Sequence, residues 1–93
     1  MSVMVRIPTP LRKLTAEREV VDGDGSDLSA CIESLETQYP GLKDRLCDEN
    51  GDLRRFVNVY VNGEDVRFLA GLSTALQAGD EVSIVPAVAG GES

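Results

Sequence analysis

Apolar and polar residues alternate in three runs of this chain, at residues 3–7, 56–61 and 81–86. A period of two is typical of a β-strand that buries one face, because successive side chains point to opposite sides. Pro8 follows the first run and Pro86 closes the last, and a proline is tolerated at the end of a strand. The runs therefore predict three strands, with inward-facing sets Val3, Val5 and Ile7, then Val57, Val59 and Val61, then Val82 and Ile84.

Weaker patterns predict two further strands. Residues 17–21 follow a turn at residues 11–15 and are expected to return as the second strand of an N-terminal hairpin, with residues 22–25 as a loop. Asn62 and Gly63 both tolerate a positive φ, so they predict a hairpin turn after the strongest strand. We expect a short returning strand at residues 64–68, then a loop or a turn of helix at residues 71–76.

One amphipathic helix is predicted between residues 27 and 39. Ser26 or Asp27 would cap its start, and a Pro-Gly pair at residues 40–41 would end it. Leu42 and Leu46 predict one further short helical turn that covers an open end of the core. Apolar residues recur at helical spacing along one stripe of the main helix, namely Leu28, Cys31, Ile32, Leu35 and Tyr39.

The order strand, strand, helix, strand, short strand, strand predicts an α+β fold of the β-grasp (ubiquitin-like) type. Its mixed sheet would contain four to five strands, with the one main helix packed across it. If the first and last strands are parallel neighbours, the helix supplies the crossover that parallel pairing requires. We therefore expect a domain at residues 1–86 and a flexible tail at residues 87–93 that leaves from the middle of the sheet.

Composition narrows the possible functions. The 93 residues carry a formal net charge of −7, which opposes binding to nucleic acid or to an anionic membrane surface and favours partners with basic surfaces. No apolar run approaches the length of a membrane span, and the N-terminus lacks the hydrophobic core of a signal peptide. We therefore expect a cytoplasmic protein. Arg54, Arg55 and Arg67 are interpreted as solvated strand charges, with a partner contact as the alternative.

Neither catalysis by the chain itself nor a bound metal is expected. The sequence has no histidine, which removes the commonest general base, and Cys31 and Cys47 fit no metal-ligand spacing. A disulfide between these cysteines would be unusual in a reducing compartment. We expect Cys31 to be buried on the helix stripe and Cys47 to lie nearer the surface. The acidic segment at residues 22–33 departs from the calcium-loop and phosphate-loop patterns, because each lacks a required glycine.

The segment after Pro86 has almost no side-chain bulk. Residues 87–91 are only alanine, valine and glycine, and Gly90 and Gly91 have no Cβ, so another protein could close on their backbone from either side. One interpretation is a tail that enters a partner's active site, with the Gly91 carbonyl as the reacting group. The other is an ordinary chain end. Val85, an apolar residue on the face opposite the core set, is either a surface valine or a docking contact.

Residues 79–91, GDEVSIVPAVAGG, resemble the C-terminal signature of the MoaD/ThiS family of ubiquitin-like sulfur carrier proteins. That signature consists of a Gly-Asp turn, a last strand that ends near proline, and a terminal Gly-Gly. Residues 55–68, RFVNVYVNGEDVRF, extend the resemblance over much of the chain. It is greatest to the members of the family that serve cysteine synthesis.

The resemblance implies that the chain is a protein cosubstrate and not an enzyme. An E1-like adenylyltransferase/sulfurtransferase would use ATP to convert the Gly91 carboxylate into an acyl-adenylate and then into a thiocarboxylate. Partners would require the narrow tail formed by Val88, Ala89 and Gly90. A PLP-dependent cysteine synthase would receive the sulfur, and the carrier itself would bind no cofactor.

Glu92 and Ser93 depart from the family pattern, in which the mature tail ends at the second glycine. Gly91 has no free carboxylate while these two residues are attached. The resemblance therefore implies a processing step in which a JAMM-type zinc peptidase cleaves between Gly91 and Glu92.

Other functions share parts of this pattern. Within the family, the small subunit of molybdopterin synthase and the carriers for thiamine or secondary-metabolite sulfur use the same tail chemistry. A ubiquitin-like protein modifier would instead join Gly91 to lysines of target proteins. An interaction module would use the fold without chemistry at the tail.

Overall fold

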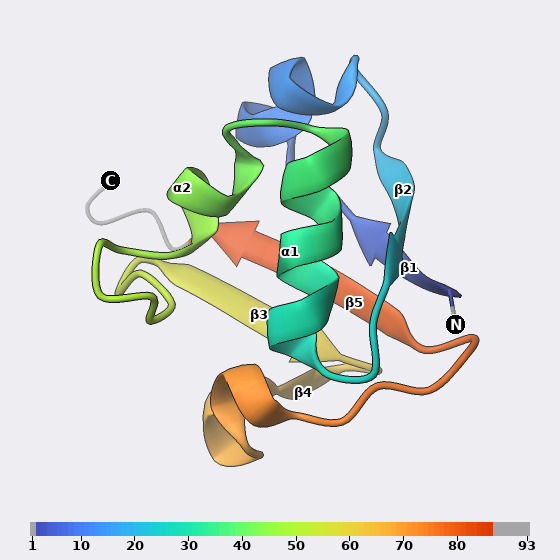
Figure 1. The fold of residues 1–93 in the computed structure, drawn as a ribbon, viewed down its shortest axis with the longest axis vertical. Helices are drawn as coiled ribbons and strands as arrows, with labels where there is room; N and C mark the ends of the chain where they lie inside the picture. The colour runs from blue at the N-terminus through green and yellow to red at the C-terminus, as the bar shows by residue number, and fades with distance from the viewer. Residues whose placement is uncertain (1, 87–93) are drawn as a thin grey trace.

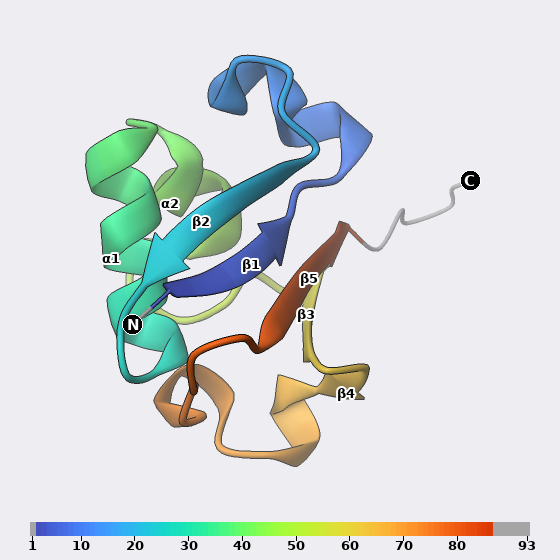
Figure 2. The ribbon, with the colours of Figure 1, turned by 90° about the vertical axis from the view of Figure 1, so that its right-hand side faces the viewer.

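A computed structural model of the protein describes residues 2–86, which form a mixed five-stranded sheet in the order β2-β1-β5-β3-β4. β1 and β5 are parallel neighbours at the centre, and the other pairs are antiparallel. This arrangement confirms the predicted β-grasp fold (Figures 1 and 2). The strands are β1 (Ser2–Arg6), β2 (Val20–Asp24), β3 (Val57–Val61), β4 (Glu64–Asp65) and β5 (Glu81–Pro86).

Helices cover one face of the sheet and leave the other open (Figure 2). α1 (Leu28–Gln38) crosses that face, and α2 (Leu42–Leu46) lies beside its end (Figure 1). None of the helices within residues 2–86 is long and apolar enough to cross a membrane. Three short 3-10 helices complete the described chain, at η1 (Thr9–Thr15), η2 (Val66–Phe68) and η3 (Gly71–Ser73).

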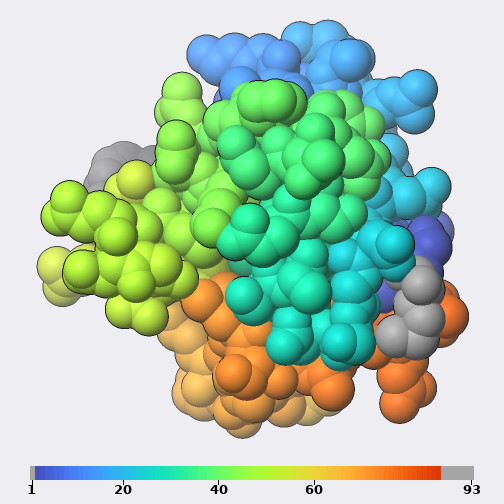
Figure 3. Space-filling model, viewed as in Figure 1, coloured from blue at the N-terminus to red at the C-terminus, as the bar shows by residue number. Residues whose placement is uncertain are grey.

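The core lies between the sheet and α1 and is built mainly from aliphatic side chains. The predicted inward sets of the three strands are all buried, as are the four stripe residues within α1. Burying one such side chain is worth about 1.5–3 kcal/mol, so the alternation read from the sequence corresponds to the main stabilising term. Leu42 and Leu46 of α2 are buried as predicted. Figure 3 shows α1 covering the middle of this face, with α2 beside it and η1 above.

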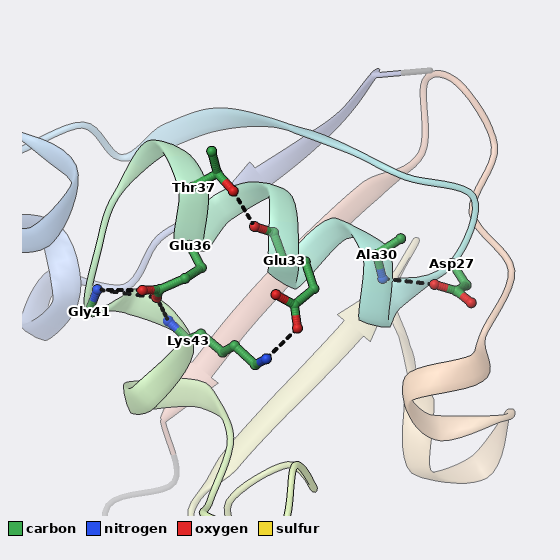
Figure 4. A network of polar contacts seen from close by, with 7 residues as sticks. All are labelled: Asp27, Ala30, Glu33, Glu36, Thr37, Gly41 and Lys43. Atoms are coloured by element: carbon green, nitrogen blue, oxygen red, sulfur yellow. Dashed lines mark hydrogen bonds and ion pairs between the residues drawn. The ribbon is translucent and has the colours of Figure 1, made fainter.

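Polar contacts set the start of α1 and attach α2 to its end (Figure 4). The Asp27 carboxylate accepts a hydrogen bond from the Ala30 backbone N–H at 2.8 Å, which confirms one of the two predicted caps. The Glu36 carboxylate accepts from the backbone N–H groups of Gly41, at 3.1 Å, and Lys43, at 3.0 Å. The Lys43 ammonium also pairs with Glu33. These contacts position α2 against the rest of the fold.

The predicted second strand is wrong by about three residues. Ala16 and Glu17 have φ values of 54° and 66°, so the chain is still turning there, and β2 begins at Val20. The predicted loop at residues 22–25 is largely strand, because β2 continues to Asp24. Gly23 is a packing residue: a Cβ at this position would lie 2.6 Å from Cys31 Sγ. Gly23, which suggested a loop in the sequence, is therefore explained by close packing against α1 and not by a turn.

Two other expectations also need correction. The returning strand predicted at residues 64–68 is only two residues long, and Asp65 then caps η2 through a hydrogen bond from the Arg67 backbone N–H at 2.9 Å. Cys47 was expected nearer the surface but is 5% exposed, because it follows α2 directly into the core. The hairpin turn itself is confirmed, with φ of 52° at Asn62 and 88° at Gly63.

Cys31 and Cys47 are free thiols inside the core. Burial, reinforced by the negative charge of Asp24, raises the pKa of Cys31 to about 11. Burial also raises the pKa of Cys47, although the nearby Lys43 ammonium acts in the opposite direction. Since the thiolate is the reactive form, both side chains are poor nucleophiles in the folded protein.

Gly23→Ala should destabilise the fold by about 1–3 kcal/mol, because the new methyl group overlaps Cys31 Sγ in a packed region. Urea unfolding followed by circular dichroism would measure the loss. The double variant Gly23→Ala/Cys31→Ala should lose less than the sum of the two single variants, since removing Sγ makes room for the methyl group. Strictly additive losses would contradict this account of Gly23.

Neither thiol should react appreciably with iodoacetamide in the native protein at pH 8, whereas both should react after unfolding in guanidinium chloride. The reason is the combination of burial and raised pKa at each site. Intact-mass analysis would count the adducts with time. Labelling of Cys47 in the folded protein at its unfolded rate would show that this side chain is accessible after all.

Candidate functional site

Residues 84–86 of β5 extend beyond the point at which its pairing with β1 ends. Pairing with β1 runs only to Arg6 opposite Ser83, whereas pairing with β3 continues to Val57 opposite Pro86. Residues 84–86 are therefore supported by β3 alone at the edge where the chain leaves the sheet. Ile84 is buried and fixes this end to the core. The end of β5 is thus held by its pairing with β3 and by the burial of Ile84.

The start of β5 is fixed by a network around Asn62. The Asn62 side-chain amide donates to Asp80 Oδ1 at 3.1 Å, and its carbonyl oxygen accepts from the Glu81 N–H at 3.0 Å. Asp80 Oδ2 accepts from the Gln77 N–H at 2.8 Å. The backbone hydrogen bond from Gln77, followed by that from Asn62, lowers the pKa of the Asp80 carboxyl. Asn62 and Asp80, which the sequence predicted only as turn residues, therefore set the position of β5.

Arg67 holds the start of β3, the strand that supports Pro86. Its guanidinium donates to Asn58 Oδ1 at 2.6 Å and to the carbonyl oxygens of Arg54 and Val57 at 2.9 and 2.8 Å. Arg67 is exposed, as the interpretation of a solvated charge expects, but it lies in η2 and not in a strand, and its guanidinium is held by three acceptors. These acceptors belong to β3 and the segment before it, so no pattern local to Arg67 signals this role.

An open groove of about 580 Å³ lies beside the end of β5. One side is formed by β5 and the start of β3, and the others by η1, α2 and the segment before β3. Aliphatic and aromatic side chains share this lining with two arginines and one aspartate. The lining residues described are Pro10, Leu11, Asp44, Arg45, Arg54, Phe56, Val57, Ile84 and Pro86.

Val85 lies on the open face of the sheet, as predicted, and is 43% exposed. Its register partners there are polar: Asn58 lies opposite it on β3, and Ser83 precedes it on the same face. Met4 on β1 is also 43% exposed, but it pairs with Glu81, near the other end of β5. Val85 is therefore an exposed apolar side chain with polar neighbours in the described sheet, beside the point where the chain leaves it.

The proposed reacting and processing residues, Gly91 and Glu92, lie outside the described residues, and so do Val88, Ala89 and Gly90. Within residues 2–86, no group of three or more histidine, cysteine, aspartate or glutamate side chains is arranged to hold a metal ion. Asp22 and Asp24, which suggested a calcium loop, lie in β2. The part of the site that the structure describes is the end of β5, from which the chain continues to these residues.

Comparison with known proteins places these features in a family. The ThiS family model matches residues 5–91, so the match includes the Gly-Gly pair and stops before Glu92. The sulfur carrier protein CysO of Mycobacterium tuberculosis is 53% identical over 93 aligned residues, which cover 98% of this chain and all of CysO.

More distant relatives include other small carriers and modifiers. Small archaeal modifier protein 3 of Haloferax volcanii is 38% identical, covering 98% of this chain and all of the relative. The molybdopterin synthase sulfur carrier subunit of M. tuberculosis is 38% identical over 83% of this chain and 78% of its own length.

A solved structure has the same fold over nearly the whole chain. A chain in the crystal structure of the BexX/CysO complex of Amycolatopsis orientalis matches with a TM-score of 0.90 and 46% identity, covering 96% of this chain and 99% of that one. The relatives named here are sulfur carrier proteins and a small archaeal modifier protein. With both the family model and a relative matching over almost its full length, the chain belongs to the ThiS family and is a homologue of the sulfur carrier protein CysO.

Proposed function

We propose that this protein carries sulfur as a thiocarboxylate on Gly91 and delivers it for cysteine biosynthesis. The observation that carries the proposal is the 53% identity to CysO over the whole chain, together with a family match that stops at Gly91. Glu92 and Ser93 would first be removed by a JAMM-type zinc peptidase, which exposes the Gly91 carboxylate. The domain at residues 1–86 would be the part that partner enzymes bind. Residues 87–91 would form the reactive arm, which carries the reacting group into their active sites.

The chemistry requires activation by a partner. A carboxylate is a poor electrophile, so an E1-like adenylyltransferase would let its oxygen attack the α-phosphorus of ATP and displace pyrophosphate. A sulfur nucleophile would then attack the acyl carbon of the adenylate and displace AMP, leaving the thiocarboxylate. The carrier contributes orientation, because its carboxylate is tethered to a folded base, and the partner contributes the electrostatic stabilisation.

A narrow arm suits this chemistry for a physical reason. Without side chains beyond methyl and isopropyl groups, residues 87–91 could pass through a closed channel, and a closed channel keeps water from the acyl-adenylate. The pairing of β5 with β3 up to Pro86 supports the proposal, because it fixes the point from which the arm starts and so limits the orientations that the arm must sample. A PLP-dependent cysteine synthase would then receive the sulfur on an activated serine.

A second candidate function is protein modification. It is favoured by the 38% identity to small archaeal modifier protein 3, which also extends over nearly the whole chain. The two functions share activation of Gly91 and differ in the final acceptor. The carriers for molybdopterin, thiamine and secondary metabolites differ from the leading proposal in the acceptor as well.

A chain ending at Gly91 should gain the mass of one oxygen-to-sulfur exchange when it is incubated with ATP, the E1-like enzyme of the same organism and a sulfide donor. The chain ending at Ser93 is the matched control and should gain nothing until the peptidase is added. Intact-protein mass spectrometry measures both. Sulfur transfer without trimming would refute the processing step, and no transfer to either chain would refute the carrier function.

The acceptor is tested separately with the thiocarboxylated chain. Incubation with a PLP-dependent cysteine synthase and an activated serine should consume the thiocarboxylate and yield cysteine after peptidase release. An isopeptide bond between Gly91 and a lysine of a target protein would favour the modifier function instead.

Val85→Asp should weaken the productive complex with the activating enzyme and raise its KM by about tenfold, the effect of losing a central apolar contact. Met4→Asp is the matched control, because Met4 has the same 43% exposure on the same face but lies away from the exit. Steady-state kinetics on chains ending at Gly91 would give the two KM values. Equal effects of the two substitutions would exclude Val85 as a partner contact.

A further inference from the structure

The groove beside Pro86 has preformed walls. α2 is attached to α1 by Glu36, and the Arg54 Nε donates to the Asp44 carbonyl oxygen at 2.8 Å, which joins α2 to the segment before β3. On the η1 side, the Leu11 N–H donates to the Pro8 carbonyl oxygen at 2.9 Å. A site whose walls are already held loses little conformational entropy when a ligand binds.

The lining of the groove combines apolar surface with positive charge. Phe56 is 57% exposed and lies with Leu11 and Ile84 on its apolar part. The Arg45 side chain is exposed, and its guanidinium forms no hydrogen bond or ion pair within residues 2–86. The Arg54 Nε donates to the Asp44 carbonyl oxygen, and its guanidinium forms no ion pair with a carboxylate of the described residues. The described lining therefore carries two cationic groups against one carboxylate.

The positive charge of the groove lining is opposite in sign to the net charge of the protein. The formal net charge is −7, but much of the negative charge lies at the opposite edge of the sheet. That edge is formed by the end of β2, the β3–β4 turn and the turn before β5. These segments contain no lysine or arginine, and their acidic residues are Asp22, Asp24, Glu64, Asp65, Asp80 and Glu81, of which Glu81 pairs with Arg6 of β1.

We propose that the groove binds an acidic–apolar segment of the activating enzyme, in which a carboxylate meets Arg45 and Arg54 and a neighbouring apolar side chain packs on Leu11 and Phe56. The inference rests on the proposed function, because Pro86 both lines the groove and begins the tail that the enzyme would receive. An enzyme that encloses the tail must lie against this edge. Its entrance therefore carries acidic residues, in contrast to the basic partner surface expected from the net charge.

The opposed edges also orient the approach of the two proteins. An acidic entrance attracts the groove edge and repels the acidic edge, which favours the encounter that presents the tail. This attraction acts between solvent-exposed groups, so added salt weakens it.

Direct binding tests the proposal independently of sulfur transfer. Calorimetric titration of the E1-like enzyme with the chain ending at Gly91 should give a Kd that Arg45→Gln raises about threefold to fivefold, the effect of losing one exposed charge pair. Gln77→Glu changes the net charge by the same amount at the opposite edge, on an exposed side chain, and should leave the Kd within about twofold. Arg45→Lys should retain most of the affinity, because it keeps the charge.

The other outcomes overturn the proposal, except the last, which separates it from the proposed function. Equal Kd values for Arg45→Gln and the unsubstituted chain, an equal effect of Gln77→Glu, or no binding at all would show that the groove does not contact this enzyme. Self-association abolished by Arg45→Gln would assign the groove to a second copy of the chain. Normal binding with the Arg45 effect but no thiocarboxylate would refute the carrier function and leave the contact in place.

Discussion

The pairing of β5 between a parallel and an antiparallel neighbour is the constraint on which the rest of this structure depends. Parallel pairing with β1 requires a crossover, and α1 within that crossover covers the buried side chains of Val82 and Ile84. Antiparallel pairing with β3 continues to Pro86 after β1 has turned away. The position at which the chain leaves the sheet therefore follows from the hydrogen-bond ladder of the central strand.

Several polar side chains outside β5 hold the elements that surround this hydrogen-bond ladder. Asn62 and Asp80 fix the start of β5, while Arg67 fixes the start of β3, opposite the end of β5. Glu36 positions α2, which forms one wall of the groove. Each of these contacts holds an element that borders β5 or the groove, although none of them involves the residues at the end of β5. The candidate site is thus a product of the whole domain, even though its proposed chemistry concerns one glycine.

The sequence predicted the strands with clean alternation and the helix with a continuous stripe, since those patterns report burial directly. The predictions from the sequence failed where one residue type occurs in two kinds of structural position. Gly23 suggested a loop, but the close approach of Cys31 requires a residue without Cβ inside β2. Cys47 follows a polar, charged helix and nevertheless enters the core, because Leu42 and Leu46 direct the same face of α2 inward. Arg67 gave no local signal, because its acceptors come from the segment around β3.

By itself, the sequence determined the order of elements, the fold, and the Gly-Gly pattern that indicates the family, because periodicity, turn chemistry and motifs are local properties of a chain. Only the tertiary structure decided which charges surround the exit. Arg45 and Arg54 come from segments on either side of a loop, Leu11 from η1 and Pro86 from the end of the chain described. Packing brings them together, and a net charge of −7 cannot reveal a basic groove, because a sum over the chain contains no information about position.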